Sequence, residues 1–70
     1  MNMNKIFNYG DKLMWAPMDD PFHNEYECIV CEVGDLYAIA RTFDGMRLWI
    51  DEDNIEEFKL NGFRLILMED

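Results

Sequence analysis

The residues that could perform covalent catalysis are few. The sequence contains no serine, and its only threonine is Thr42, so a serine-based catalytic triad is excluded. The remaining candidate is a cysteine paired with His23, the only histidine. Cys28 and Cys31 lie in a run with Ile and Val, where a thiol usually packs as an inert apolar side chain. We therefore predict that the protein is not an enzyme and has no catalytic residue.

Cys28 and Cys31 also form a Cys-x-x-Cys motif, which is typical of metal and redox sites. Residues i and i+3 of a strand point to opposite faces. Even if a bulge brought both onto one face, their Cα atoms would be about 10 Å apart at the rise of a strand, too far for a disulfide. Zinc usually draws such a pair from a turn. We expect free cysteines, no metal and no other cofactor.

The densest group of charges is the acidic segment, residues 51–57, which contains five acids and no base. It lacks the glycine and the ligand spacing of a calcium loop. Two interpretations remain open: a solvated acidic turn, or a patch that contacts a basic protein groove. On the second, the acidic residues that bind the partner are Asp51, Glu52, Asp53, Glu56 and Glu57. Asp19, Asp20 and Glu25, in and beside the predicted loop at residues 18–24, would add to the patch.

Trp49 is the aromatic residue nearest to the acidic segment. If Leu48 and Ile50 face the core, alternation along a strand turns Trp49 outward, with Arg47 on the same face. An exposed tryptophan is a frequent hot spot of binding. We predict that Trp49 is the apolar anchor of a partner-binding surface.

The net charge of −9 is large for 70 residues. It argues against direct binding of nucleic acid, which requires Lys and Arg side chains to displace counterions from phosphates. An acidic surface suits a basic partner, including a protein that itself holds nucleic acid. The alternative is that the charge only keeps an apolar-rich domain soluble. Both interpretations remain open.

The length predicts one domain, residues 1–70. No segment is apolar enough to span a membrane, the first residues lack the apolar core of a signal peptide, and two cysteines do not make a secreted disulfide scaffold. We expect a cytoplasmic protein that is a monomer or a weak homodimer.

Short apolar runs separated by Gly, Pro and Asp predict an all-β fold of five to six antiparallel strands. We expect the strands near residues 11–16, 25–33, 36–42, 46–50, 57–60 and 63–68. Asp44-Gly45 and Asn61-Gly62 predict hairpins. Between the fourth and fifth strands we expect a single helical turn, capped by Asp51 or Asp53.

The second hairpin should place Leu60 opposite Phe63 and Phe58 opposite Leu65, with all four on one face. Alternation along the strands then predicts which residues face the core. The predicted core is Leu13, Ile29 or Val30, Ile39, Leu48 or Ile50, Ile55, Phe58, Phe63 and Leu65.

The order of these signals resembles a known family of small barrels. GDKLMWA at residues 10–16 resembles the opening strand of Tudor-like, SH3-type barrels, and YECIVCEV at 26–33 resembles their second strand. YAI at 37–39 with the Asp44-Gly45 turn resembles their third strand, and LWI at 48–50 with NI at 54–55 resembles the fourth strand and its 3-10 turn. The resemblance covers roughly residues 9–55. It implies a small SH3-like (Tudor-like) barrel, to which the C-terminal hairpin is an addition.

Tudor-like domains bind protein partners, some of them through an aromatic cage for methylated Lys or Arg. Here the usual cage positions hold Pro17, Arg41 and Asp44. The aromatic residues left to line a pocket are Tyr26 and, as an addition to it, Phe43 or Trp49. The resemblance therefore implies the fold and a binding role, and it adds Tyr26 to the predicted partner-binding residues.

Two functional hypotheses follow. The first is a non-enzymatic protein-binding module whose acidic surface occupies a basic groove. It would be a phage or mobile-element accessory protein that inhibits host nucleic-acid-binding or defence machinery. An anti-CRISPR protein is one example of this class. The second is a Tudor-like reader or adaptor that binds a peptide or modified side chain through an aromatic pocket. Binding through the acidic surface should weaken more steeply with rising salt concentration than binding through the aromatic pocket.

Overall fold

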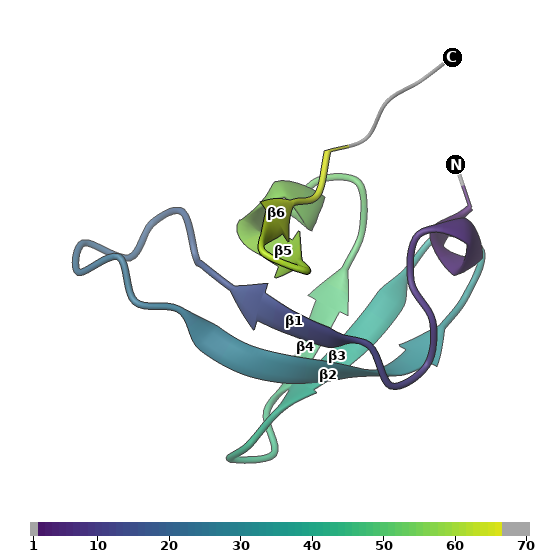
Figure 1. Cartoon of the computed structure of the whole chain (residues 1–70), viewed down its shortest axis with the longest axis horizontal. Coiled ribbons are helices and arrows are strands. Elements are labelled where there is room, and N and C mark those ends of the chain that lie inside the picture. The colour runs from purple at the N-terminus through teal and green to yellow at the C-terminus, as the bar shows by residue number, and fades with distance from the viewer. Residues whose placement is uncertain (1, 67–70) are drawn as a thin grey trace.

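The computed structural model describes residues 2–66. Within this range the chain forms six antiparallel strands in one sheet, in the order β4-β3-β2-β1-β5-β6 (Figure 1). There is no α-helix in this range, and hence no helix able to cross a membrane. The elements are η1 (Met3–Lys5), β1 (Lys12–Trp15), β2 (Tyr26–Val33), β3 (Ala38–Thr42), β4 (Arg47–Ile50), η2 (Ile55–Glu57), β5 (Phe58–Leu60) and β6 (Phe63–Arg64), where η denotes a 3-10 segment.

The all-β prediction is confirmed, and each predicted strand corresponds to an observed one. Five of the six strands begin one or two residues later than predicted, and four of the six end at the predicted residue. The strand predicted at 63–68 ends at Arg64, and residues 67 and 68 lie outside the described residues.

Glycine-containing turns set the two hairpins. Asn61 and Gly62 both have positive φ, 55° and 84°, which is the backbone of a type I′ turn. This turn pairs Leu60 with Phe63, as predicted. The hairpin between β3 and β4 is also confirmed, and its loop contains Asp44-Gly45 and is closed by hydrogen bonds between Thr42 and Met46.

A β-bulge in β2 changes which residues face the core. Before it, Cys28 and Val30 point inward and are buried. The register with β3 then skips Cys31, so that Glu32 is exposed and Val33 packs against the core. One extra residue in a strand reverses the alternation beyond it, which is why the inward side passes from even-numbered to odd-numbered positions.

The core lies on one face of the sheet. Predicted members that are buried are Leu13, Val30, Leu48, Ile50, Ile55 and Phe58. Met3 and Phe7, which lie before the first strand, are also buried and were not predicted. The Met3 N–H donates to the Asp35 carbonyl at 2.8 Å, which ties the N-terminal segment to the turn between β2 and β3. This segment therefore closes one end of the core.

Two predicted core positions are wrong. Ile39 lies between Ala38 and Ala40, and these two are buried, so alternation leaves Ile39 facing outward and half-buried. Phe63 is 77% exposed, although its pairing with Leu60 is as predicted. It belongs to a two-residue strand at the edge of the sheet, and correct pairing alone does not bury a side chain there. Leu65 is half-buried and packs against the core.

The sheet is open. Its two edges are β4 and β6, and within residues 2–66 no strand pairing joins β4 to β5 or β6. Figure 1 shows the short β5–β6 hairpin directly above β1, the strand with which β5 pairs. The hairpin thus covers part of the core without closing the sheet by hydrogen bonds.

Candidate functional site

Trp49 lies on the outward face of β4 and is 54% exposed, as alternation along the strand predicts. Its ring stacks on Tyr37, with the centroids 4.5 Å apart and the planes within 9° of parallel. The Tyr37 hydroxyl donates to Glu32 at 2.5 Å. Behind the Tyr37 ring there is no room for a side chain at Gly34, where an added Cβ would lie 2.3 Å from a ring carbon. Trp49 is therefore exposed and also held in one orientation.

The turn after Trp49 is closed by its own side chains. The Trp49 indole N–H donates to Asp51 at 3.0 Å, and the other carboxylate oxygen of Asp51 accepts from the Asp53 N–H at 2.9 Å. The Asn54 amide accepts from the Asp51 N–H at 2.8 Å and donates to the Trp49 carbonyl at 2.7 Å. The predicted capping role of Asp51 or Asp53 is wrong, because Asn54 occupies the N-cap of η2 and makes no side-chain cap bond.

Three acids of the acidic segment, Glu52, Asp53 and Glu56, are exposed. Within residues 2–66 the only ion pair joins Lys59 to Glu25, at 2.6 Å. The three carboxylates are therefore not neutralised by a base of this part of the chain.

A second group of predicted residues lies in a concave site, here called the aromatic pocket. It is lined by Trp15, Pro17, Met18, Asp19, Tyr26, Asp44, Met46 and Glu57. The centroids of the Trp15 and Tyr26 rings are 5.5 Å apart, and their planes are tilted by 41°. Trp15 is fixed from behind, where it stacks on buried Phe58 at 6.4 Å. The two rings thus form an aromatic side of the pocket.

The charged groups that line the aromatic pocket are all acidic: Asp19, Asp44 and Glu57. Glu57 accepts a hydrogen bond from the Trp15 indole N–H at 3.3 Å. The Thr42 hydroxyl donates to the Asp44 carboxylate and lowers the pKa of Asp44, which keeps it ionised. Aromatic faces and carboxylates both attract cations, so the pocket is chemically matched to a positively charged group.

The predicted partner-binding residues therefore fall into separate groups. Tyr26, Asp19 and Glu57 line the aromatic pocket, and Trp49 is joined to Asp51 at the turn. Asp20 has a different position: its carboxylate accepts from the N–H groups of Phe22 at 2.9 Å and Asn24 at 3.3 Å. Such bonds close the loop locally, so Asp20 shapes the loop that includes Asp19.

The resemblance stated from the sequence put Pro17, Arg41 and Asp44 at cage positions, with Tyr26 near them, and of these Pro17, Asp44 and Tyr26 line the pocket. Nothing in the sequence placed Trp15 or Met46 there. Trp15 lies at the end of β1 and Met46 lies in the β3–β4 hairpin, and the spacing of these two residues does not show that their segments meet. The one feature that the sequence could have indicated is that Trp15 and Tyr26 lie opposite each other across β1 and β2.

Cys28 and Cys31 are free thiols, and residues 2–66 contain no cluster of His, Cys, Asp and Glu side chains able to hold a metal. Cys28 is buried, and its thiol lies 3.7 Å from the Leu13 carbonyl, to which it donates. Burial raises the pKa of the Cys28 thiol from 9.0 to about 11, because a thiolate is poorly solvated there. Cys28 therefore stays protonated at neutral pH.

We expect the Cys28 thiol to react slowly in the folded protein. In a Cys31→Ala variant, the reaction with Ellman's reagent at pH 8 should be at least about 100-fold slower when folded than when unfolded in urea, since only thiolate reacts. Because the folded pKa lies above the unfolded one, the free energy of unfolding should also fall between pH 9 and 11. Equal rates for the folded and unfolded chains would contradict the buried placement of Cys28.

No protein-family model, curated protein or solved structure matches this chain.

Proposed function

We propose that the protein is a non-enzymatic binding module for a basic protein surface, and that a lysine or arginine side chain of the partner enters the aromatic pocket. The observation that supports this proposal most strongly is the composition of the pocket. The Trp15 and Tyr26 rings stand beside three carboxylates, and no base lines the site. A cation against a ring face gains about 0.5–2 kcal/mol, and ionised acceptors strengthen its hydrogen bonds.

Trp49 and the acidic segment provide a second contact with the same kind of partner. Exposed acids that repel one another gain free energy when a basic surface approaches. Trp49 adds apolar area at a fixed position beside them, because it is stacked on Tyr37 and bonded to Asp51. In this proposal the acids increase the rate of association, and Trp49 slows dissociation.

The order of the elements supports an SH3-like, Tudor-like architecture, which is part of the proposal. β1 pairs with both β2 and β5, and the 3-10 segment η2 lies between β4 and β5. The resemblance seen in residues 9–55 implies the same arrangement, and domains of that family bind proteins. The proposed module therefore uses a small β scaffold to present its loops to a partner.

The biological role that we propose is inhibition of nucleic-acid-binding machinery of a host by a phage or mobile-element accessory protein. The net charge of −9 supports this role, since a groove that holds nucleic acid is basic and attracts a compact acidic protein. The module would occupy the groove and exclude the nucleic acid.

A second candidate is a reader or adaptor that recognises one modified cationic side chain. The tilted pair of Trp15 and Tyr26 favours it, because two rings in contact with one cation are the basis of methyl-lysine recognition. This candidate predicts that trimethylation of a lysine in the ligand strengthens binding and that salt has little effect. The first candidate predicts that trimethylation weakens binding and that affinity falls steeply as the salt concentration rises.

The pocket can be tested by an NMR titration of the ¹⁵N-labelled protein with a short peptide rich in lysine and arginine. We expect shifts of the Trp15 indole N–H and of the Tyr26 and Met46 amides. Tyr26→Ala should weaken binding about tenfold, as loss of an aromatic anchor does. Tyr9→Ala is the matched control, since Tyr9 is exposed and lies outside the aromatic pocket. Shifts confined to other residues, or equal losses for the two variants, would refute the pocket.

A further inference from the structure

The outward face of the sheet has a line of basic side chains that the sequence does not reveal. Lys12 of β1 pairs with Ile29 of β2, which pairs with Arg41 of β3. Arg41 in turn pairs with Arg47 of β4. These four exposed residues, here called the basic row, cross four strands. Half of the six basic residues of a protein with net charge −9 thus lie in one line.

The charges of the basic row are not neutralised within the described chain. Arg41 and Arg47 are directly opposite each other, an arrangement of like charges that destabilises a sheet. The only ion pair within residues 2–66 involves Lys59 and Glu25, at another place. An acidic ligand would therefore relieve repulsion that the fold leaves in place.

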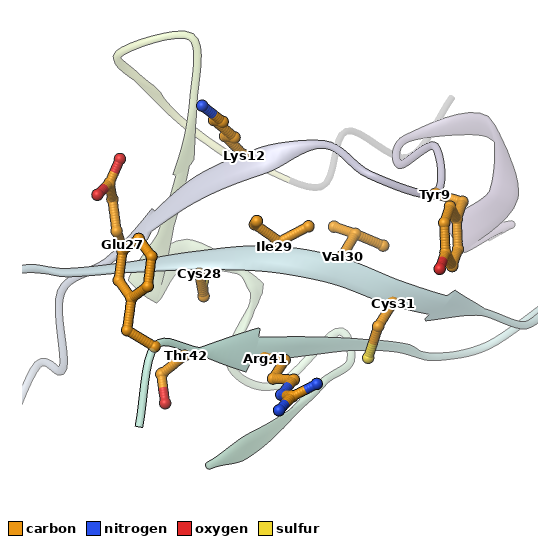
Figure 2. A pocket seen from close by; sticks show the side chains of 10 residues that line it. Tyr9, Lys12, Glu27, Cys28, Ile29, Val30, Cys31, Arg41 and Thr42 are labelled. Atoms are coloured by element: carbon orange, nitrogen blue, oxygen red, sulfur yellow. The ribbon is translucent and has the colours of Figure 1, made fainter. Parts of the chain in front are cut away.

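A groove of about 540 Å³ lies along part of the basic row. Figure 2 shows its side chains, which come from the segment before β1, from β1, from β2 and from the end of β3. Three of them are exposed apolar or aromatic residues: Ile29 at 42%, Tyr9 at 81% and Phe43 at 86%. Because Ile29 lies between Lys12 and Arg41 in the row, the groove offers apolar surface between two positive charges.

We propose that this groove binds an acidic segment of a partner protein, in which an apolar residue lies between two carboxylates. Neighbouring strands are about 4.8 Å apart, which puts Lys12 and Arg41 about 10 Å apart on either side of Ile29. In an extended peptide, residues i, i+2 and i+4 share one face, so an apolar residue at i+2 lies between carboxylates at i and i+4. Those two positions are about 13 Å apart, a separation that the long side chains of Lys12 and Arg41 can span. One carboxylate then binds Lys12, the apolar side chain lies on Ile29, and the second carboxylate binds the fork of the Arg41 guanidinium.

Charge also favours an acidic peptide segment over a nucleic acid or a second copy of this chain as the ligand of the groove. A nucleic acid presents an unbroken line of phosphates and needs many basic contacts, whereas the groove has the Glu27 carboxylate on its lining and the whole protein is strongly negative. A second copy of this chain would bring another −9 to the interface. A short acidic segment with apolar residues meets less of this repulsion and uses both the charges and the apolar surface.

The test is a fluorescence-anisotropy titration with a labelled peptide of sequence Glu-Ser-Leu-Ser-Glu, which in extended form presents both glutamates and the leucine on one face. Wild type should bind it at low salt, and should bind the same peptide with glutamine for glutamate at least about tenfold more weakly. Arg41→Gln should weaken binding of the glutamate peptide about tenfold, and Ile29→Asn should weaken it severalfold without a change of charge. Arg64→Gln, which removes an exposed charge in β6, should leave binding within about twofold. Thermal unfolding of each variant verifies the fold.

Four results would overturn the proposal. The first is equal affinity for the glutamate and glutamine peptides. The second is an equal loss of affinity for Arg64→Gln and Arg41→Gln, which would indicate general attraction to charge. The third is tighter binding of a single-stranded oligonucleotide through Arg41, and the fourth is a dimer in sedimentation that Arg41 holds together. This site is separate from the aromatic pocket, so failure here would leave the proposed binding of basic partners standing.

Discussion

Phe58→Ala should destabilise the protein by about 3–5 kcal/mol, the usual cost of removing a buried phenylalanine. Phe58 is 1% exposed, pairs with Trp15 across β1 and β5, and stacks on its ring. Small domains are stable by only about 5–15 kcal/mol, so the variant should unfold at a much lower urea concentration than wild type. Tryptophan fluorescence during urea unfolding measures the change.

Phe63→Ala is the matched control, because it removes the same side chain from a position that is 77% exposed. Its cost should stay below about 0.5 kcal/mol, as for most surface substitutions. If Phe58→Ala does not fold, Phe58→Leu should still cost more than Phe63→Leu. Similar losses of unfolding free energy at the two positions would contradict the placement of Phe58 in the core and of Phe63 at the surface.

Reversing exposed acids of the acidic segment should slow binding to basic ligands. We expect Glu52→Lys with Asp53→Lys to reduce the association rate for an immobilised lysine- and arginine-rich peptide by about tenfold at low salt. Both side chains are exposed and accept no hydrogen bond within residues 2–66, so the change should leave the fold intact. The association phase in surface plasmon resonance gives the rate.

A second double variant separates steering by the acidic segment from the effect of net charge. Glu27→Lys with Asp35→Lys changes the net charge equally at exposed positions elsewhere, and should slow association much less. Trp49→Ala tests the apolar anchor instead, and should mainly speed dissociation, about tenfold for a hot-spot tryptophan. If the two double variants slow association equally, the acidic segment has no special role.

Local sequence signals were sufficient to predict most of the sheet. Asn61-Gly62 and the Asp44-Gly45 pair specify turns by their backbone preferences, and these turns set the register on both sides. Alternation then predicted Leu13 and either Leu48 or Ile50 as inward, with Trp49 outward, and all three inward candidates are buried. These features depend on near neighbours in the chain, which is why a single sequence reveals them.

The misplaced core residues depend on contacts that are distant in sequence. Met3 and Phe7 have no periodic pattern around them, and they are buried because the N-terminal segment folds back to the turn at Asp35. The bulge at Cys31 is the insertion of one residue into a pairing, and the sequence around it is that of an ordinary strand. Phe63 was predicted from its partner alone, without knowledge of what covers the hairpin.

The candidate sites were predictable only in part, for a similar reason. Trp49 and the acidic segment are neighbours in sequence, and their association was visible there. The aromatic pocket requires the loop after β1 to meet the β3–β4 hairpin. The basic row requires the register of three strand pairings, since Lys12, Arg41 and Arg47 are scattered along the chain.

The proposed binding of a basic protein surface through acidic and aromatic side chains is tested by the dissociation constant of the lysine- and arginine-rich peptide, measured by fluorescence anisotropy from low to high salt. We expect binding at low salt that weakens at least about tenfold as the salt rises to several times the physiological concentration, because exposed charges are then screened. The Tyr26→Ala variant should bind more weakly throughout. No binding at low salt, or binding that neither salt nor Tyr26→Ala weakens, would contradict the proposed function.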